Sequence, residues 1–280
     1  IMLRIKPGID AHTHQFIRTG QIDSKFGFAL ENGEALAAVK EAVSCPNILL
    51  KGLHCHIGSQ IFDLSPFELA AEVMLRFAGR LSRELQVTVT ELNLGGGFGI
   101  RYQEGDDAKP YGDFMKKVSA EVKRVCEEEN LPVPFVVIEP GRSVVGPAGT
   151  TLYRVGSVKE IEGVRNYVSV DGGMTDNPRY ALYQAPYTLC VANRANAGAD
   201  YTATIAGKCC ESGDLIQEHT QIQRPQAGDL LAVFCTGAYN YSMASLYNRT
   251  PRPAVVMVKE GQSRVIVRRE SYDDLIRNDL

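Results

Sequence analysis

Residues 92–100 read LNLGGGFGI, an alternating apolar pattern that runs directly into a cluster of glycines. Leu92 and Leu94 alternate as the residues of a strand do. Gly95, Gly96 and Gly97 then leave a turn whose backbone N–H groups can surround an anion. The segment does not match the dinucleotide motif G-x-G-x-x-G, and the chain contains no G-x-x-x-x-G-K-[ST]. It therefore predicts either a phosphate site at a strand end or a glycine-rich turn without a ligand.

Around this stretch, the first half of the chain alternates predicted strands with predicted helices. Ser65, Pro66 and Glu68 match a capping box, with Ser65 as the N-cap and Pro66 as the first helical residue. Strand–helix alternation of this kind is typical of parallel βαβ units. The predicted strands are 2–5, 48–58, 89–94 and 134–140, and the predicted helices cover the stripe Leu36, Val39 and Val43, residues 65–81 and residues 110–129.

The sequence pattern changes in the second half of the chain. From Pro147 onward, short β-rich runs such as NYVSVDGG and DLLAVFC dominate, so we expect a mostly antiparallel β domain. We place the domain boundary between residues 1–146 and 147–280. In the first part, three predicted strands end in the polar or glycine-rich segments HCHIGSQ, GGGFG and EPGRS. In a parallel barrel this is the face that binds ligands, phosphates included.

Composition narrows the classes of function. The 280 residues are 44% hydrophobic and carry a net charge of −3, which gives no basic footprint for nucleic acid or an anionic membrane. No apolar run reaches the length of a transmembrane helix. The seven cysteines are scattered, which favours reduced thiols and a cytoplasmic protein. Because the chain opens with Ile1 already in a strand pattern, we expect it to be a fragment.

The residues at the strand ends suggest specific chemistry. His54 and His56 share one face of a strand, but Cys55 points the other way, so a zinc site lacks its third ligand and no metal is expected. An imidazole can instead stack on an aromatic cofactor, with Ser59 beyond it donating to a phosphate. Glu139 follows the apolar run FVVI, where it would pair with a protonated pyridine nitrogen or form a structural ion pair with Arg142.

Seven segments resemble, in this order, the fold-type-III decarboxylases that depend on pyridoxal 5'-phosphate (PLP): SKFGF, GLHCHIGSQ, LNLGGGFGI, EPGRS, DGGMTDNPRYALYQA, CESGD and GAYNYSMASLYN. The resemblance runs from the first residues to the last. It implies an α/β plus all-β fold, in which the C-terminal portion of a (β/α)8 TIM-like barrel of the alanine racemase type precedes a mostly antiparallel β-barrel or sandwich domain. It also implies a head-to-tail homodimer with active sites shared between the copies, and PLP as the cofactor.

Transferred to matching positions, the family's roles fall into four groups: cofactor contacts, proton delivery, substrate contacts and an ion pair between copies. The resemblance implies that His56 stacks on the pyridine ring, Glu139 pairs with its nitrogen, and Cys210 returns a proton to the substrate carbon. Further cofactor contacts are implied for Ser59, Gly95, Gly96, Gly97, Gly141, Arg142 and Tyr239. Substrate contacts are implied for Arg142, Arg179, Tyr183, Glu211 and Tyr239, and an ion pair between copies for Lys25 and Asp214.

A thiol such as Cys210 can deliver a proton near neutral pH, and its neighbour Cys209 is expected to face away because adjacent strand positions alternate.

Charge indicates the substrate class. A plain diamine needs only an anionic contact for its distal amine. Arginines beside Glu211 suit a substrate with both an amine and a carboxylate at its far end. This is meso-2,6-diaminopimelate, whose decarboxylation gives L-lysine; carboxynorspermidine, arginine and ornithine are the alternatives.

The sequence departs from the family in one respect. The family's Schiff-base lysine lies at the end of an early barrel strand, and Lys25 and Lys51 do not occupy that position. Four strand–helix units are visible where a barrel has eight. We therefore expect a C-terminal fragment of the enzyme. The alternative is a catalytically inactive relative that acts as a binding or regulatory protein.

Overall fold

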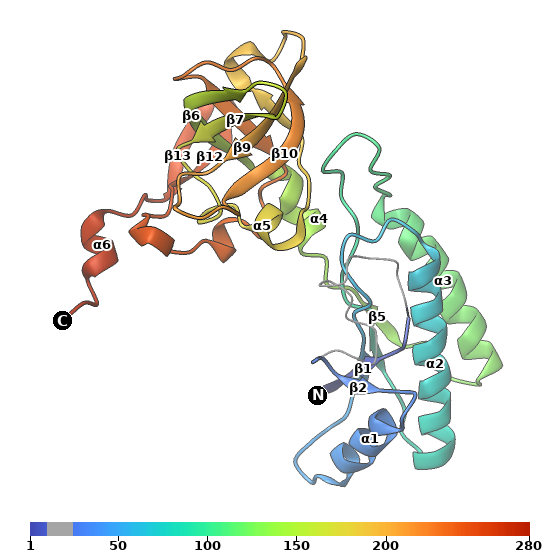
Figure 1. Cartoon of the computed structure of the whole chain (residues 1–280). Helices are drawn as coiled ribbons and strands as arrows, with labels where there is room; N and C mark the ends of the chain where they lie inside the picture. Colours follow the sequence, from blue (N-terminus) through green and yellow to red (C-terminus); the bar gives the residue numbers. More distant parts are fainter. Residues whose placement is uncertain (10–24) are drawn as a thin grey trace. The chain divides into compact units, whose positions relative to one another are not determined.

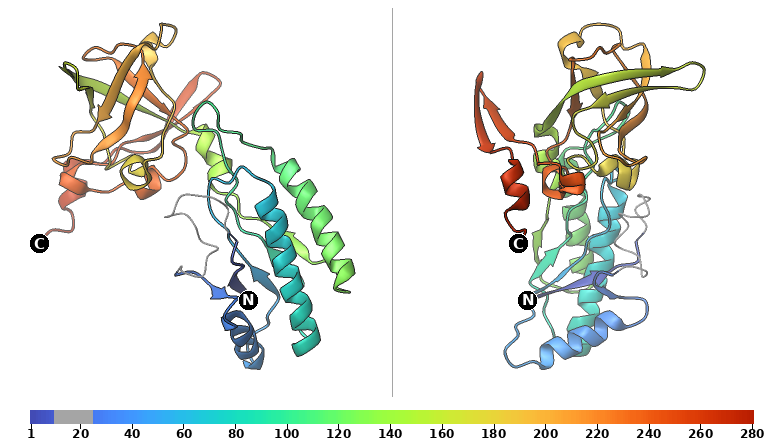
Figure 2. Two further views of the ribbon diagram at one scale, coloured as in Figure 1. Left: turned by 45° about the vertical axis from the view of Figure 1, so that its right-hand side comes forward. Right: turned by 60° about the vertical axis from the view of Figure 1, so that its left-hand side comes forward.

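The computed structural model describes residues 1–9 and 25–280, which form two compact units (Figure 1). The first unit comprises residues 1–101 and 105–144, and the second comprises residues 102–104 and 145–280. The two units differ in their secondary structure. Long helices accompany short strands in the first, whereas strands dominate the second (Figure 2).

The first unit is built on a five-stranded sheet in the order β2-β1-β3-β4-β5, in which every neighbouring pair is parallel. The predicted βαβ alternation is therefore confirmed. The strands are β1 (Met2–Lys6), β2 (Phe28–Ala29), β3 (Gly52–His54), β4 (Glu91–Asn93) and β5 (Phe135–Val137). The helices are α1 (Glu34–Ser44), α2 (Ser65–Leu85), α3 (Tyr111–Glu128) and the short α4 (Arg142–Val145).

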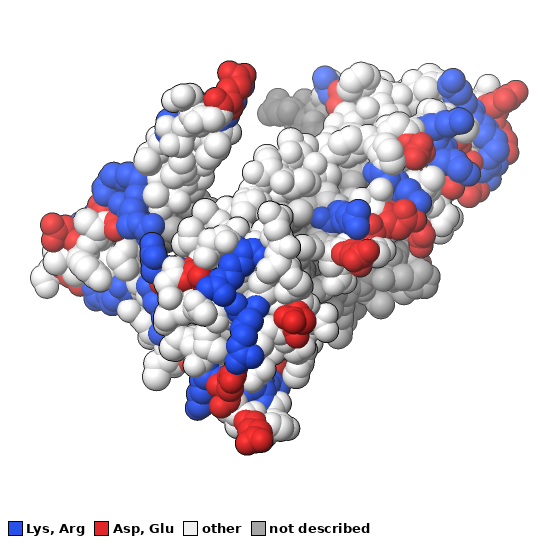
Figure 3. Space-filling view, turned by 90° about the horizontal axis from the view of Figure 1, so that it is seen from above, with Lys and Arg blue, Asp and Glu red and all other residues white. Residues whose placement is uncertain are grey.

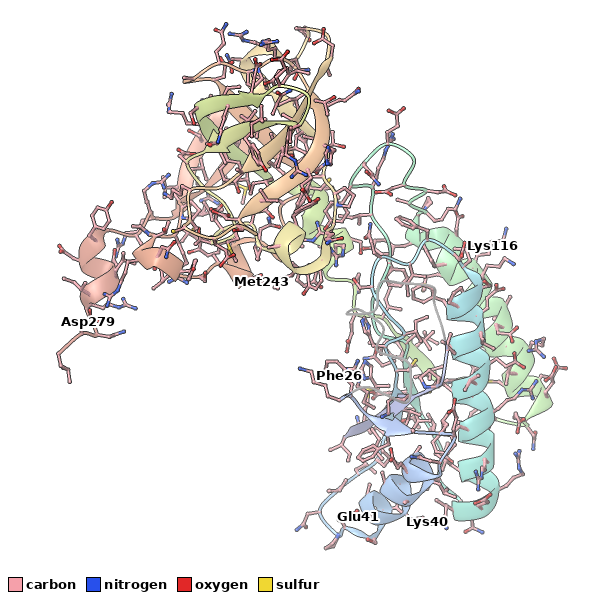
Figure 4. The ribbon with its side chains drawn as sticks, viewed as in Figure 1. Phe26, Lys40, Glu41, Lys116, Met243 and Asp279 are labelled. Carbon is pink, nitrogen blue, oxygen red and sulfur yellow. The ribbon has the colours of Figure 1, made fainter. Side chains whose placement is uncertain are left out.

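The two faces of this sheet have different surroundings. Leu53 and Leu92 belong to the same buried core as Phe67 of α2 and Val118 of α3, so one face packs against the helices. The opposite face carries a row of polar residues that the register aligns across neighbouring strands, namely Arg4, His54 and Asn93. The exposed side chains of Lys40, Glu41 and Lys116 mark the outer surfaces of α1 and α3 (Figure 4).

Two local predictions about the helices are wrong. Leu64 is the N-cap of α2 and no side chain caps this end, so Ser65 lies inside the first turn and the capping box is absent. In α1 the buried residues are Ala35, Val39 and Ala42, whereas Val43 is exposed. The buried residues follow the spacing i, i+4 and i+7, which sets the stripe that packs inward, and Val43 lies at the margin of this stripe.

The second unit contains a six-stranded sheet in the order β10-β9-β7-β6-β11-β8. Only the pair β7–β9 is parallel among these neighbours, so the mostly antiparallel β domain is confirmed. The strands are β6 (Thr150–Ile161), β7 (Arg165–Val170), β8 (Leu189–Val191), β9 (Tyr201–Ala206), β10 (Leu215–Ile222) and β11 (Leu230–Phe234). A separate hairpin of β12 (Val255–Lys259) and β13 (Gln262–Val267) precedes α6 (Tyr272–Ile276), and α5 spans Arg179–Tyr183.

The surface carries both signs of charge. On the face drawn in Figure 3, acidic and basic side chains lie among one another. On α2 and α3 they form ion pairs, such as those of Arg76 with Glu72 and Glu128. Within the described part of the chain, no helix combines the length and apolar character needed to cross a membrane.

Candidate cofactor and substrate site

Three neighbouring strands of the first unit bring all the predicted cofactor residues except Tyr239 to one edge of the sheet. His56 and Ser59 follow β3, and Glu139 and Arg142 follow β5. The glycines 95–97 follow β4, which lies between them. Because parallel strands end at the same edge, these segments meet. Arg142 Nη2 donates a hydrogen bond of 2.9 Å to Ser59 Oγ, so two of the residues predicted to hold the phosphate contact each other directly.

The glycine cluster is packed tightly between its neighbours. A Cβ on Gly96 would lie 2.2 Å from the carbonyl oxygen of Glu139, and one on Gly97 would lie 2.4 Å from that of Gly58. Gly97 also has a φ of +105°, which residues with a side chain rarely adopt. The backbone of the adjacent strand ends therefore requires glycine at these positions. The role of the glycines in binding a phosphate stays a prediction.

His56 is held as a neutral ring. Its Nδ1 accepts a hydrogen bond of 3.2 Å from the Gly96 N–H. Burial is the main cause that lowers its pKa to about 4, and the nearby Arg4 adds to the effect. The imidazole is thus uncharged near neutral pH, and its Nδ1 is engaged by the glycine turn. A flat, neutral ring in this position suits stacking against an aromatic cofactor.

Glu139 is positioned by a residue that sequence reasoning missed. Asn93 Nδ2 donates to Glu139 Oε1 at 2.8 Å, and Asn93 Oδ1 accepts from the Gly95 N–H at 2.9 Å. The Asn93 side chain therefore links the carboxylate to the glycine turn. His54 Nε2 lies 3.5 Å from Glu139 Oε2. The one available indication was the polar residue inside the apolar strand end of LNLGGGFGI.

Arg4 is a second residue that the sequence did not point to. It lies opposite His54 in the β1–β3 register. Burial lowers the pKa of Arg4, while the Glu139 carboxylate opposes this shift. A cation therefore faces the carboxylate and the two histidines from the neighbouring strand. Across the described residues no group of three His, Cys, Asp or Glu side chains has the arrangement of a metal site.

The second unit carries the predicted proton donor in the loop after β9. Cys210 is exposed and its N–H donates to Asn248 Oδ1 at 3.1 Å. Cys209 is half-buried, and burial is the main cause that raises its pKa to about 11. The two thiols thus differ in access, but the predicted reason is wrong. They lie in a bend and not in a strand, so strand alternation does not separate them.

Asp214 organises the same loop from inside. Its side chain is buried, and its carboxylate accepts the N–H groups of Met174 at 2.6 Å and Cys209 at 2.7 Å. A Cβ on Gly207 would lie 2.2 Å from the same carboxylate. Lys25 is exposed in the first unit. The predicted pairing of Lys25 with Asp214 of a second copy stays a prediction.

The remaining substrate residues lie on two segments of the second unit. Arg179 and Tyr183 begin and end α5, a spacing of four residues that places them on one side of the helix. Tyr239 follows β11 with a φ of +62°, an uncommon conformation for a residue with a side chain. Glu211 is exposed beside Cys210, and its Oε1 accepts from the Gly213 N–H at 3.3 Å.

Comparison with known proteins extends this description. Residues 1–146 match the model of the family described as "Pyridoxal-dependent decarboxylase, pyridoxal binding domain". Diaminopimelate decarboxylase from Bacillus subtilis (strain 168) is 52% identical over 280 residues, which is 100% of this chain and 64% of that protein.

The solved structures that resemble this chain also include diaminopimelate decarboxylases. Diaminopimelate decarboxylase from M. jannaschii in co-complex with L-lysine superposes with a TM-score of 0.89 at 34% identity, covering 100% of this chain and 63% of that one. The Helicobacter pylori enzyme complexed with L-lysine gives a TM-score of 0.86 at 31% identity, covering 98% of this chain and 65% of that one. The fold is therefore the C-terminal portion of a (β/α)8 barrel followed by a β domain. The chain spans about 64% of the length of the curated relatives it matches.

Proposed function

This chain belongs to the pyridoxal-dependent decarboxylase family, and we propose that the enzyme it is part of converts meso-2,6-diaminopimelate to L-lysine. The observation that carries the proposal is the set of contacts at the edge of the parallel sheet. There Asn93 holds Glu139, Gly96 holds His56, and Arg142 holds Ser59. These contacts offer a carboxylate, a flat neutral ring and a cationic phosphate contact to one cofactor. The residues that make these contacts include those to which the family resemblance assigns PLP binding, namely His56, Ser59, Gly96, Glu139 and Arg142.

Each protein group has a distinct task in the proposed reaction. PLP, when bound, accepts into its ring the electron pair that the departing carboxylate leaves behind. Glu139 keeps a proton on the ring nitrogen by accepting its hydrogen bond, and Asn93 fixes the carboxylate for this task. His56 would stack on the cofactor ring through its neutral imidazole. Arg142, Ser59 and the glycine turn 95–97 hold the phosphate; within this turn the Gly97 N–H is the donor that faces it, because the N–H groups of Gly95 and Gly96 donate to Asn93 and His56. Tyr239 and Gly141 complete the cofactor contacts.

Proton delivery is assigned to the thiol of Cys210. It is exposed, whereas the half-buried Cys209 has its pKa raised to about 11. Only Cys210 therefore has the access that a proton donor to a small molecule requires. In a homodimer with shared active sites, Cys210 and Glu211 of one copy serve the cofactor of the other. The proton goes to the carbon that has lost its carboxylate, and solvent then restores the thiol.

Substrate recognition is assigned to groups of both signs. Glu211 receives the distal amine of diaminopimelate, and Arg142, Arg179 and Tyr183 receive its distal carboxylate. Lysine complexes of two relatives support this assignment, because L-lysine keeps that amine and carboxylate after the reaction. We further propose a cytoplasmic homodimer, with the barrel part in residues 1–146 and the β domain in residues 147–280. The Schiff-base lysine is assigned to a part of the enzyme that precedes Ile1.

The proposal is tested with the full-length enzyme that carries this chain. Purified enzyme is supplied with PLP and, separately, meso-diaminopimelate, carboxynorspermidine, arginine or ornithine, and CO2 release is measured. We expect the largest kcat/KM with diaminopimelate and L-lysine as the product. Cys210→Ala should lower kcat by about 100-fold or more with little change in PLP affinity, because one positioned acid is lost.

Cys209→Ala is the matched control and should retain most of the activity. The cysteine assignment is wrong if Cys209→Ala abolishes turnover while Cys210→Ala keeps it. A full-length protein that binds PLP but decarboxylates none of the four substrates indicates the inactive, regulatory relative. Faster turnover of ornithine or arginine than of diaminopimelate contradicts the substrate assignment.

A further inference from the structure

The second unit contains a buried arginine without an acidic partner. The side chain of Arg179 is only 5% exposed. Over the residues that the structure describes, its guanidinium forms no ion pair, and its Nη1 has no hydrogen-bond partner. An uncompensated buried charge is costly, so surrounding groups must stabilise it or a ligand must complete it.

Two tyrosine rings supply the stabilisation. The centre of the Arg179 guanidinium lies 4.0 Å from the ring centroid of Tyr102 and 5.0 Å from that of Tyr187. The two rings meet edge to face, with centroids 5.6 Å apart and an interplanar angle of 77°. Their electron-rich faces attract the cation most strongly where water is excluded, and both rings are buried. The two rings pack against the guanidinium, and its buried Nη1 keeps a hydrogen-bond donor without a partner.

Hydrogen bonds anchor the backbone of both tyrosines and the hydroxyl group of Tyr187. The N–H and Oγ1 of Thr188 both donate to the carbonyl oxygen of Tyr102, at 2.9 and 2.8 Å. Tyr187 OH donates to Asn177 Oδ1 at 2.9 Å, and the Tyr187 N–H donates to Gln217 Oε1 at 2.6 Å. These contacts form without a ligand and order the cage that Tyr102 and Tyr187 make around Arg179. Preorganisation of this kind is what a carboxylate-binding arginine needs.

We propose that Tyr102 is a positioning residue that aims Arg179 at the distal carboxylate of the substrate. In this role it sets the preference for ligands with that carboxylate over plain diamines. The inference rests on the proposed function, in which Arg179 receives the carboxylate. Tyr102 lies outside every motif that the sequence pointed to, and it acts through Arg179 without contacting the substrate.

The inhibitors L-lysine and cadaverine distinguish a positioning role of Tyr102 from a general effect on stability. L-Lysine carries the distal carboxylate, whereas cadaverine has the same carbon chain with an amine at each end and no carboxylate. In the full-length enzyme with PLP, Tyr102→Met removes the ring face but keeps an apolar side chain. We expect about a tenfold rise in the KM for meso-diaminopimelate and in the Ki of L-lysine. The Ki of cadaverine and kcat should change less than about twofold, because neither depends on the Arg179 plane.

Tyr102→Phe keeps the ring and should restore wild-type values. Tyr167→Met is the matched control, since Tyr167 also lies beside an arginine, at 5.7 Å from Arg165, but outside the cage. If Tyr102→Met does not yield folded enzyme, pentafluorophenylalanine at position 102 keeps the shape and weakens the ring face, and should reproduce the shift. An equal change in the Ki of both inhibitors, or none in either, overturns the inference. Wild-type enzyme that fails to decarboxylate diaminopimelate overturns the proposed function instead.

Discussion

Asn93 illustrates how single side chains assemble the cofactor site. Its amide donates to Glu139 Oε1 and accepts from the Gly95 N–H, and it is only 6% exposed. One residue thus contacts both the carboxylate that we propose for the ring nitrogen and the turn that we propose for the phosphate. Its role depends on the register that aligns β4 with β5, which the sequence does not reveal.

The first prediction concerns this residue. In the full-length enzyme, Asn93→Leu should weaken PLP binding by about 10- to 100-fold, because a hydrogen bond to a charged group and a second one to the turn are lost. Equilibrium dialysis with absorbance detection of PLP measures the change. Asn166→Leu is the matched control, because Asn166 Nδ2 donates to a backbone carbonyl, that of Thr202, at 3.0 Å in the second unit. Equal PLP affinity in both variants would remove Asn93 from the site.

The second prediction concerns pH and His56. Its pKa falls from an ordinary value of about 6.5 to about 4 in the folded chain, mainly because the ring is buried. The unfolded chain therefore binds more protons at intermediate pH, so the full stability is present above about pH 6.5 and is lost as pH falls towards 4. His56→Phe keeps a flat ring without this titration.

Urea unfolding of the apo-enzyme between about pH 7 and 4.5 measures the effect. Wild type should lose roughly 1–2 kcal/mol more than His56→Phe over that range, after a discount for partial solvent access. Parallel pH profiles for the two proteins would show that His56 accepts a proton as readily in the folded chain as in the unfolded one.

Residues with side-chain chemistry inside a motif were predictable, and residues that act through tertiary contacts were not. His56, Ser59, Glu139 and Arg142 were proposed from their motifs, and the structure brings them to one edge of the sheet. Arg4, Asn93 and Tyr102 were missed because their partners belong to other strands or segments. Lys6, the last and buried residue of β1, was also overlooked as a lysine near that edge.

Elements were predicted well where their periodicity is strong. The helix expected over 110–129 is α3, Tyr111–Glu128, and its apolar stripe is buried. Strands were predicted too long, since only Gly52–His54 of residues 48–58 is paired as a strand. The polar residues after β3 leave the sheet and contribute to the candidate site. Strand β10, with the sequence LIQEHTQI, was not anticipated because its apolar residues, Leu215, Ile216 and Ile222, do not alternate with polar ones.

The third prediction concerns the tight contact between the segments that follow β4 and β5. Gly96→Ala should destabilise the enzyme by roughly 1–3 kcal/mol, because its Cβ would lie 2.2 Å from the Glu139 carbonyl oxygen and force the strand ends apart. Gly112→Ala in α3 meets no atom within 4 Å and should stabilise by about 0.5–1 kcal/mol. Urea unfolding of both variants checks the pair. A neutral Gly96→Ala would contradict the tight packing of this turn.

At the scale of the whole molecule, the sequence predicted two structural classes, and the structure shows both. The parallel unit and the strand-rich unit follow from hydrophobic periodicity and turn residues that are local in the chain. The family resemblance added the cofactor and the reaction, which periodicity does not encode. The chain also spans only about 64% of the length of the relatives it matches. We propose that protein outside this chain completes the site.

We propose that this chain supplies the surroundings of the cofactor and that another part of the enzyme supplies its covalent anchor. Borohydride reduction of the full-length enzyme with PLP, followed by peptide mapping, identifies the lysine bonded to the cofactor. We predict a single labelled lysine, located before Ile1, and simultaneous loss of diaminopimelate decarboxylation. A single label on Lys6, or on any other lysine of the 280 residues, would contradict the account.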